Sequence, residues 1–324
     1  MAEGRKGLGS YGRIPWSKAD TRATRKMTEE EIRKVQEEDR RVKIAAQGVQ
    51  GAWTTWDTTE SRKPSWKDVL NTPDRALSFL LRAISDTLPT PVNLTRWGLQ
   101  DTNTCCLCNS APASLRHILS SCKVALKEGR YTWRHDQVLK SIAAHIDSIV
   151  KTPQSNSSGH RFTSFVKEGD KAPKPGPQSH RTGLLQQAAD WYIRADVGDR
   201  LVFPTAVAIT RLRPDIVITS TNTKTVILVE LTVPWEDRLE ESHEIKRNKY
   251  EDLLNEARQN GWKAHHFPVE VGCRGFPSRS MRFMLKSLGM PPAKCKTACK
   301  RIGEEAERCS RWLWLRHKDK WLFQ

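Results

Sequence analysis

Hydrophobic and β-branched positions are densest in residues 212–236, LRPDIVITSTNTKTVILVELTVPWE, where two apolar runs flank a polar turn. The turn TNTK, residues 221–224, favours chain reversal because asparagine tolerates turn geometry. Alternate side chains along a strand point to the same face of a sheet. Folding the two runs about the centre of the turn therefore predicts a hairpin in which Asp215 lies opposite Glu230 on one face.

Residues 236–262 have helical periodicity, and residues 263–272 have the pattern of a further strand. The apolar stripe of the expected helix consists of Leu239, Tyr250, Leu253, Leu254 and Ala257. Lys246 falls near the middle of this stripe and Lys249 falls at its edge. Lysine is almost never fully buried unpaired, so carboxylates or a metal-bound hydroxide would explain these positions. The alternative is a lysine whose stem covers apolar surface while its amine reaches water.

The N-terminal quarter of the chain is predicted to be helical. Residues 26–47 form a charged helix pattern in which Thr28 and Glu31 fit a capping box. Its thin apolar stripe consists of Ile32, Val35 and Val42. Short helices separated by prolines follow up to residue 100.

Composition divides the chain into expected segments. Residues 184–197, LLQQAADWYIRADV, are predicted to form an amphipathic helix at the start of the sheet region. The segments are a disordered basic leader (1–25), a helical region (26–100), a cysteine cluster with a helix (101–150), a linker that allows a short strand at RFTSFV (151–182), the sheet region (183–290) and a basic, Trp-rich C-terminal helix (291–324).

The cysteine cluster, TCCLCNSAPASLRHILSSC, has the spacing C-x2-C-x8-H-x4-C. The four candidate ligands are Cys105, Cys108, His117 and Cys122. Three thiolates and one imidazole complete a tetrahedral shell suited to structural Zn²⁺, with the first pair on a tight turn and the second on one helical turn. Cys106 is the spare thiol and can replace Cys105 only with a tighter spacing; the alternative is a set of buried, unliganded cysteines. Cys295 and Cys299 lack nearby histidines and are expected in the core or on the surface.

The net charge indicates the class of partner. The chain has 54 lysine and arginine residues against 37 acidic residues, a formal charge of +17, and such a field attracts polyanions. Nucleic acid is therefore the first partner to expect, and an anionic membrane surface the second. No apolar run reaches the roughly 18 residues of a membrane span, and the N-terminus lacks the apolar region of a secretory signal. The eight cysteines are expected in a reducing compartment, where close spacing favours metal over disulfide.

The negative charges of the two acids in the predicted hairpin must be compensated. Residues directly opposite each other have Cβ atoms about 5 Å apart, and two carboxylates that close repel each other in an apolar setting. A divalent cation between Asp215 and Glu230 would relieve this repulsion. Mg²⁺ prefers oxygen ligands and takes one or two carboxylates, with water and phosphate completing its shell.

These motifs together resemble a known family. Pro214-Asp215, fourteen residues and then Glu230-Leu231-Thr232 is similar to the PD-(D/E)xK nuclease signature. The order of zinc knuckle, GRYTWRHDQVL, RPD…E and KRNKY resembles the C-terminal region of non-LTR retrotransposon polyproteins, which carry a restriction-like endonuclease downstream of reverse transcriptase. SFLLRAISDTLPTPVNLTRWGL looks like the region that links polymerase to knuckle in that family, and the resemblance covers roughly residues 30–315.

The resemblance implies an α/β fold with a restriction-endonuclease-like central mixed sheet, flanked by helices and preceded by a helical segment and a small zinc knuckle. It implies Asp215 and Glu230 as Mg²⁺ ligands, joined by the Leu231 carbonyl. The family lysine is expected two residues after Glu230, where this chain has threonine; in members with that substitution, the lysine comes from the following helix. Lys246 fits best and Lys249 is the reserve, and a further acid from the first helix is Asp190.

The expected activity is Mg²⁺-dependent nicking of DNA by phosphodiester hydrolysis, with both acids holding the metal and Lys246 orienting the attacking water or helping to deprotonate it. The Asp-Asp pair of a polymerase is missing from the sequence, so reverse transcription is not expected. The alternatives are a non-catalytic nucleic-acid-binding remnant and a nuclease that cuts DNA junctions. The expected partner is DNA, with structured RNA as the alternative and no membrane, in the nucleus or in the cytoplasm before import.

Several basic and aromatic residues are candidate nucleic-acid contacts. Arg213 can neutralise a phosphate or be a solvated charge at a strand end. Arg134 and His135 can touch nucleic acid or only buttress the knuckle, and His135 is not expected to be a catalytic base because no neighbour in sequence would orient it. Trp312 and Arg316 lie in a tail that suits base stacking and phosphate contact, although packing of this helix on the core is the favoured interpretation.

Overall fold

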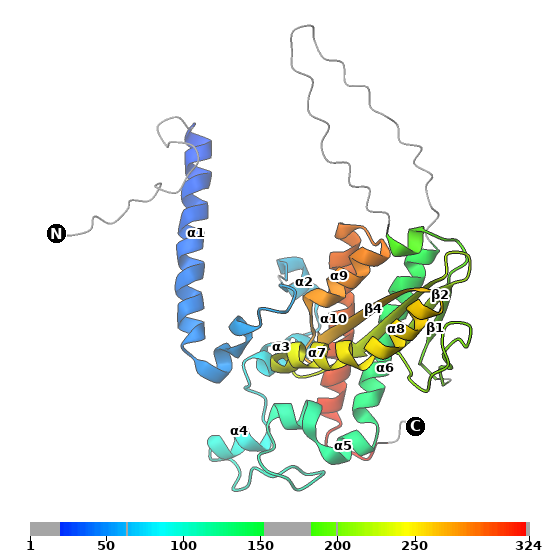
Figure 1. Ribbon diagram of the computed structural model, residues 1–324. Coiled ribbons are helices and arrows are strands. Elements are labelled where there is room, and N and C mark those ends of the chain that lie inside the picture. Colours follow the sequence, from blue (N-terminus) through cyan, green and yellow to red (C-terminus); the bar gives the residue numbers. More distant parts are fainter. Residues whose placement is uncertain (1–19, 63, 152–182, 199, 322–324) are drawn as a thin grey trace, which may run out of the picture. The chain divides into compact units, whose positions relative to one another are not determined.

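The computed structural model describes residues 20–62, 64–151, 183–198 and 200–321 (Figure 1). These residues divide into two compact units. One unit comprises the described residues up to Asp57 together with Leu81–Thr87, and the other comprises the described residues of Thr58–Leu80 and those from Leu88 onwards. The second unit contains the cysteine cluster, the sheet and the C-terminal helix.

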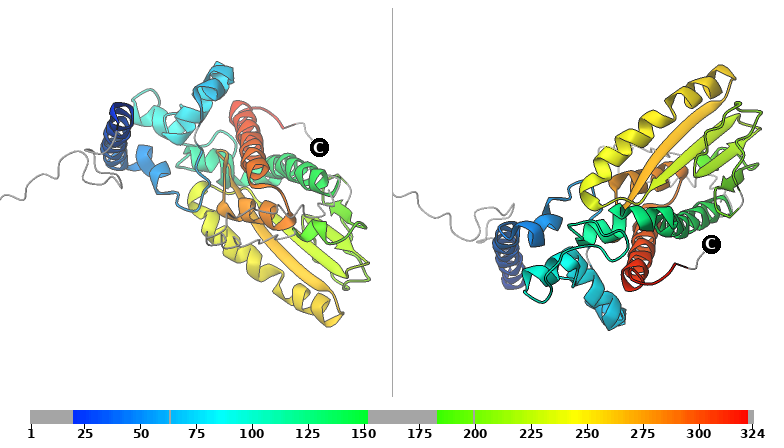
Figure 2. Two further views of the ribbon diagram at one scale, coloured as in Figure 1. Left: turned by 90° about the horizontal axis from the view of Figure 1, so that it is seen from above. Right: turned by 90° about the horizontal axis from the view of Figure 1, so that it is seen from below.

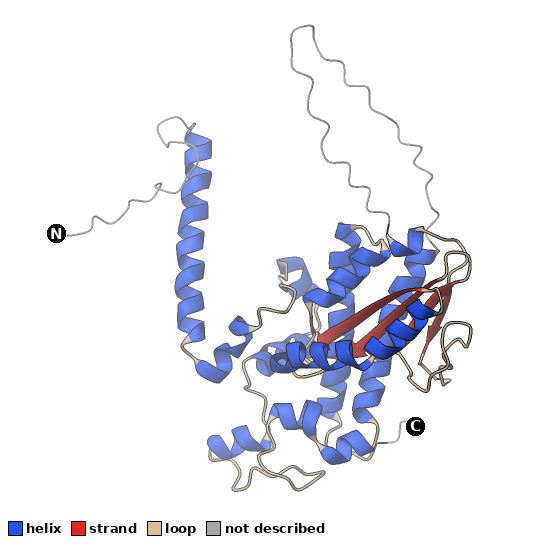
Figure 3. Ribbon diagram, viewed as in Figure 1, coloured by secondary structure: helices blue, strands red, loops and turns tan. Residues whose placement is uncertain are grey.

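The sheet has five strands in the order β1-β2-β3-β4-β5, drawn red in Figure 3. The strands are β1 (Tyr192–Ala195), β2 (Ile216–Ser220), β3 (Thr225–Thr232), β4 (Lys263–Gly272) and β5 (Phe276–Pro277). Only the β3–β4 pair is parallel, so the sheet is mixed. The predicted hairpin is confirmed, because Ile216 pairs with Val229 and this register places Asp215 opposite Glu230.

Helices cover both faces of the sheet (Figure 2). The first face carries α7 (Leu239–Lys249) and α8 (Glu251–Gln259), preceded by the short η5 (Glu236–Arg238). The second face carries α6 (Arg130–Val150), α9 (Arg279–Leu288) and α10 (Pro292–Leu315). Covered faces explain why β3 is apolar along most of its length, since seven of its eight residues are buried.

The helix predicted over 236–262 is divided at Tyr250 into α7 and α8. The predicted stripe is nevertheless correct, because its members are all buried: Leu239, Tyr250, Leu253, Leu254 and Ala257. Leu253, Leu254 and Ala257 pack with Val217, Val226 and Leu228 of the hairpin in one apolar cluster. The stripe fixes the rotation of both helices, so that Lys246, which lies within it, also faces the sheet and reaches Glu230.

The first unit begins with α1 (Thr21–Ala45), followed by η2 (Gly48–Thr55). The helix starts earlier than the sequence indicates: Asp20 is the N-cap, and Thr28 lies inside the helix with its hydroxyl bonded to the Thr24 carbonyl. The capping box at Thr28 is therefore wrong, and residues 21–25 are helical rather than disordered. The predicted stripe of Ile32, Val35 and Val42 is exposed.

Short helices lead towards the cysteine cluster, as the proline spacing predicts. They are α2 (Trp66–Asn71), α3 (Asp74–Ile84) and α4 (Pro91–Arg96), and the cluster contains η3 (His117–Ser121) and α5 (Lys123–Lys127). Within the second unit, Thr59 forms a bridge with Ser278 next to β5. Among the described residues, no helix combines the length and apolar character of a membrane span.

The amphipathic helix predicted over 184–197 is wrong. The segment forms the short η4 (Leu184–Gln186) and then β1, which extends the hairpin as an edge strand. Tyr192 and Ile193 are aromatic and β-branched, and both residue types favour strands when a neighbouring edge is available. The linker prediction lies mostly on residues 152–182, including the strand proposed at RFTSFV, and these are outside the described residues.

The C-terminal helix α10 packs along α6, as the favoured interpretation of the tail holds. Cys295 and Cys299 are buried in it. Arg134 of α6 joins three elements, because its guanidinium donates to the Leu119 carbonyl (2.9 Å), the Ser310 hydroxyl (3.1 Å) and the Val233 carbonyl (3.1 Å). Arg134 is only 2% exposed, so the prediction that it contacts nucleic acid is wrong. The alternative, in which Arg134 supports the knuckle from within the fold, describes its contacts.

We expect Arg134→Met to lower the free energy of unfolding by roughly 2–4 kcal/mol, because buried carbonyls that lose a donor cost about 1–3 kcal/mol each. Urea unfolding of the zinc-loaded protein, followed by circular dichroism, measures this change. Lys140→Met is the matched control, since Lys140 is exposed on the same helix and its loss should cost less than about 0.5 kcal/mol. Equal stability of the two variants would contradict the role of Arg134.

Candidate functional site

The four predicted zinc ligands meet in space. Their ligand atoms, from Cys105, Cys108, His117 and Cys122, all lie within 4.8 Å of one another. Cys105 Sγ is 3.9 Å from Cys122 Sγ, and Cys108 Sγ is 3.3 Å from His117 Nε2. Three sulfurs and one imidazole nitrogen at this separation fit the tetrahedral shell of a structural Zn²⁺. Cys106 is exposed, with its Sγ 3.7 Å from the His317 carbonyl, so Cys105 is the ligand of the adjacent pair.

Local backbone geometry explains the two halves of the cluster. The first pair lies on a tight turn, as predicted, in which Asn109 N–H donates to the Cys105 carbonyl. The second pair departs from the prediction of one α-helical turn, because His117–Ser121 is a π-helix and Cys122 follows it. Five residues rotate a side chain about 140° out of line on an α-helix. A π-helix has i→i+5 hydrogen bonds and brings such a pair together.

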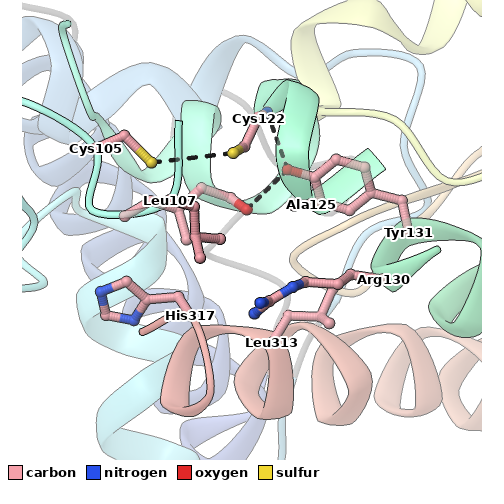
Figure 4. Close-up of a pocket in the computed structure, with 9 residues that line it drawn as sticks. Cys105, Leu107, Cys122, Ala125, Arg130, Tyr131, Leu313 and His317 are labelled. Carbon is pink, nitrogen blue, oxygen red and sulfur yellow. Dashed lines mark hydrogen bonds between the residues drawn. The ribbon is translucent and has the colours of Figure 1, made fainter. Parts of the chain in front are cut away.

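The first helical turn of α6 is hydrogen-bonded to the cysteine cluster. The Tyr131 hydroxyl accepts from Cys122 N–H (3.1 Å) and donates to the Ile118 carbonyl (2.9 Å). Figure 4 shows this hydroxyl pointing at the cysteine cluster, beside a small cavity that Leu313 and His317 of the C-terminal region also line. Burial raises the pKa of the Tyr131 hydroxyl well above its usual range, so it remains a neutral donor.

A second group of polar and charged side chains surrounds Glu230, a residue of β3 that is only 2% exposed. Its Oε1 accepts from Lys246 Nζ at 2.6 Å and from Lys249 Nζ at 3.1 Å. Its Oε2 accepts from the Tyr250 hydroxyl at 2.9 Å and from Asp215 N–H at 3.3 Å. The two lysines from one helix therefore both reach the buried acid, while their side chains remain 27% and 39% exposed.

Asp215 lies beside Glu230 at the start of β2. Its Oδ2 accepts from Leu231 N–H at 2.6 Å and lies 3.3 Å from His135 Nε2. Of the hydrogen bonds formed by the described residues, none uses Asp215 Oδ1. Asp215 is more open than Glu230, with 14% of its side chain exposed. One acid is thus held by four donors, whereas the other keeps an oxygen without a protein donor.

Tyr250, at the break between α7 and α8, closes the buried side of the site. Its hydroxyl lies 2.9 Å from both the Arg213 carbonyl and Glu230 Oε2, so its single proton serves these two acceptors. Burial, and then the charge of Glu230, raises the pKa of Tyr250 far above its usual value. The ring packs edge-on against His266, and burial lowers the pKa of that imidazole to about 4.

Sequence reasoning missed how His135 is oriented. It expected no orienting partner, yet Nδ1 lies 3.2 Å from Asp136 Oδ1 and Nε2 lies 3.3 Å from Asp215 Oδ2. Burial works to lower the pKa of His135, but the carboxylates of Asp136 and Asp215 outweigh it and raise that pKa to about 9. Asp136 follows His135 in the sequence and was a visible signal; the contact with Asp215 was not visible.

A third acid of the sheet was also missed. Glu270 on β4 pairs in register with Thr232 and is 2% exposed. Its carboxylate accepts from the hydroxyls of Ser278 (3.0 Å) and Ser280 (2.6 Å), and lies 3.0 Å from His243 Nδ1. These donors satisfy Glu270, so it ties β4 to α7 and α9.

Other predicted residues lie apart from the two acids. Arg213 is bound to Asp196, with Nη2 at 2.6 Å from both carboxylate oxygens. Asp190 binds the turn at the opposite end of β2, where it accepts from Ser220 (2.6 Å), and it is not on a helix, so its assignment as a further site acid is wrong. Arg316 lies over the Trp312 ring at 5.0 Å on α10 and its terminus.

Comparison with known proteins bears on the cysteine cluster. Residues 49–128 match a family described as zinc-binding in reverse transcriptase, and this match includes all four ligands. No curated protein matches the sequence. The chain therefore contains a zinc-binding domain of the reverse-transcriptase-associated type, which supports a relationship to retrotransposons. The matched residues end before the hairpin of Asp215 and Glu230.

We expect the purified chain to hold about one zinc ion, and His117→Ala to lose most of it and to melt at a lower temperature, because metal binding contributes directly to folding. Elemental analysis with thermal unfolding measures both effects. Cys106→Ser is the control and should retain the metal. Loss of zinc from Cys106→Ser, with retention in His117→Ala, would reverse the ligand assignment.

Proposed function

We propose that the chain is a Mg²⁺-dependent DNA endonuclease of retrotransposon origin, which nicks its target by phosphodiester hydrolysis. One observation carries the proposal: Asp215 and Glu230 lie opposite each other on paired strands, and two lysines from the next helix reach Glu230. Paired carboxylates with an ammonium beside them are the groups that metal-assisted hydrolysis of a phosphodiester requires.

The fold is compatible with a restriction-like nuclease. Such a core requires a mixed sheet between helices, with the acids at adjacent strand ends, and the second unit has this arrangement. The reverse-transcriptase-associated zinc domain precedes the sheet in the order that the resemblance implies. The restriction-like assignment rests on these two features together, and the nuclease part is our inference.

The donor set fits a hard divalent cation. Asp215 Oδ1 receives no hydrogen bond from the described residues. The four donors at Glu230 use both of its oxygens, so a cation would take the place of at least one of these donors. Asp215 and Glu230 would hold Mg²⁺, with the Leu231 carbonyl as a proposed additional ligand. The bound ion would supply Lewis-acid activation of water and of the phosphoryl group.

The chain's own residues prepare the site for this chemistry. Lys246 and Lys249 place two ammonium groups at Glu230, where they offset its buried charge and lie in reach of a water or phosphate oxygen. Tyr250 remains protonated and donates to Glu230 Oε2, which helps to fix the orientation of this carboxylate. We assign Lys246 the orientation of the attacking water, because its contact is the shorter of the two.

DNA is the proposed partner because the chain carries a formal charge of +17 and the proposed site cleaves a phosphodiester. Arg316 and Trp312 remain proposed contacts, and structured RNA remains the alternative ligand. Arg213 is engaged by Asp196, so it would need to exchange this partner before neutralising a phosphate. Action on genomic DNA would place the protein in the nucleus.

A non-catalytic nucleic-acid-binding remnant is the second candidate. The specific observation in its favour is that both oxygens of Glu230 already have protein donors, so the buried charge is compensated by the protein itself. The two candidates differ in metal affinity. The nuclease requires measurable Mg²⁺ binding that depends on Asp215, whereas the remnant requires none.

We predict that the protein nicks supercoiled plasmid in Mg²⁺, and that Asp215→Asn and Glu230→Gln each lower the rate at least 100-fold by removing a metal ligand. Gel analysis of nicked circles over time measures the rates. The matched control is Glu240→Gln, an exposed acid on α7, which should retain the wild-type rate. Nicking that survives the Asp215 substitution would exclude this mechanism.

The two lysines should contribute unequally. Lys246 Nζ lies 2.6 Å from Glu230 and its side chain is 27% exposed, against 3.1 Å and 39% for Lys249. We therefore expect Lys246→Met to reduce nicking by about 10²–10⁴-fold, the range for a positioned proton-transfer group, and Lys249→Met to reduce it by less than about tenfold. The reverse order would assign the role to Lys249.

A further inference from the structure

Helix α6 brings a side chain to the proposed metal site from outside the hairpin and the α7 helix. His135 lies between two carboxylates, with Nδ1 at 3.2 Å from Asp136 and Nε2 at 3.3 Å from Asp215. Both ring nitrogens thus face oxygen acceptors, and the imidazole plane is fixed at two points. The side chain is 25% exposed, so it lies at the wall of the site and does not project into solvent.

The backbone of α6 is anchored next to this histidine. The adjacent Arg134 binds the Val233 carbonyl, just beyond the end of the strand that carries Glu230, and also binds α10 through Ser310. Tyr131, one turn earlier, is bonded to the cysteine cluster. The position of His135 relative to the hairpin is therefore set by hydrogen bonds on both sides, of which those of Arg134 are buried.

The contact with His135 determines which way the Asp215 carboxylate faces. Leu231 N–H and His135 Nε2 both lie at Oδ2, which leaves Oδ1 as the oxygen that has no donor among the described residues. With the backbone N–H alone, the carboxylate would have one anchor, and rotation about its terminal bond would exchange the two oxygens. Two donors on one oxygen hold a single orientation. Hydrogen bonds to ligating carboxylates commonly serve this purpose in metal sites.

We propose that His135 is a positioning residue that, with Asp136, holds the Asp215 carboxylate so that Oδ1 is presented to the divalent cation. This inference rests on the proposed function for its role in nicking, but it also predicts an effect on metal binding alone. Within the part of the chain that the structure describes, the His135 ring hydrogen-bonds to Asp215 and Asp136 and not to Glu230, so it acts through one of the two proposed ligands. It is not assigned a step in proton transfer.

The experiment compares wild type, His135→Ala and His135→Gln as full-length, zinc-loaded chains. The amide of glutamine can supply an N–H donor where Nε2 lies, whereas alanine removes it. Two readouts are recorded for each: Mg²⁺ affinity by calorimetry, and the Mg²⁺ concentration that gives half-maximal nicking. We expect His135→Ala to weaken Mg²⁺ binding about 10–100-fold, the usual effect of losing an orienting partner, while nicking at saturating Mg²⁺ stays within a few-fold of wild type.

His135→Gln should recover most of the 10–100-fold loss, because its amide N–H can replace the Nε2 donor. We expect its Mg²⁺ affinity to lie within about threefold of wild type. Lys140→Ala, an exposed residue on α6, is the control for general effects on the helix. Unchanged Mg²⁺ dependence in His135→Ala overturns the proposal, as does a rate loss that persists at saturating Mg²⁺ in both variants. A wild type that binds Mg²⁺ without nicking overturns the nuclease alone, while a wild type that binds no Mg²⁺ overturns both.

Discussion

The burial of one carboxylate constrains how the elements of the second unit pack. Glu230 is 2% exposed near the end of β3, the central strand of a sheet covered on both faces. Removing one partner of a buried ion pair typically costs about 3–5 kcal/mol, because the remaining charge is uncompensated. The neighbouring elements must therefore deliver donors to this one point: α7 delivers two ammonium groups, Tyr250 a hydroxyl, and the start of β2 a backbone N–H. This requirement accounts for lysines on the sheet-facing side of an otherwise apolar stripe.

Helix α6 links the zinc domain to the sheet, and α10 also contacts both. The first two turns of α6 bind the cysteine cluster through Tyr131, the end of β3 through Arg134, and Asp215 through His135. The cysteine cluster has little apolar core of its own. Its hydrophobic core contains four buried residues, and two of these are ligand cysteines. A metal that organises this segment therefore also fixes one end of the helix that reaches the acids.

Local patterns predicted the parts of the structure that depend on short spacing. The hairpin register followed from strand alternation and the position of the turn, the helix stripe from its period, and the zinc ligands from their order. The predictions failed for features that depend on contacts between residues far apart in the sequence. Residues 184–197 have a helical period, but Tyr192–Ala195 pair with β2, because an open strand edge outweighs propensity. His135 is 80 residues from Asp215, and no local signal indicates that the two meet. Glu270 was missed because its donors come from α7, Ser278 and α9.

The central claim is that Asp215 and Glu230 share one divalent cation, and Mn²⁺ offers the most direct test of it. A crystal of the zinc-loaded protein grown with Mn²⁺, measured for anomalous scattering on both sides of the manganese absorption edge, locates this metal separately from zinc. Our account predicts a manganese peak within bonding distance of both carboxylates, about 2.1–2.3 Å for a hard cation with oxygen ligands. Manganese found elsewhere, or an ordered site in which lysine amines alone occupy the space between the acids, would contradict it.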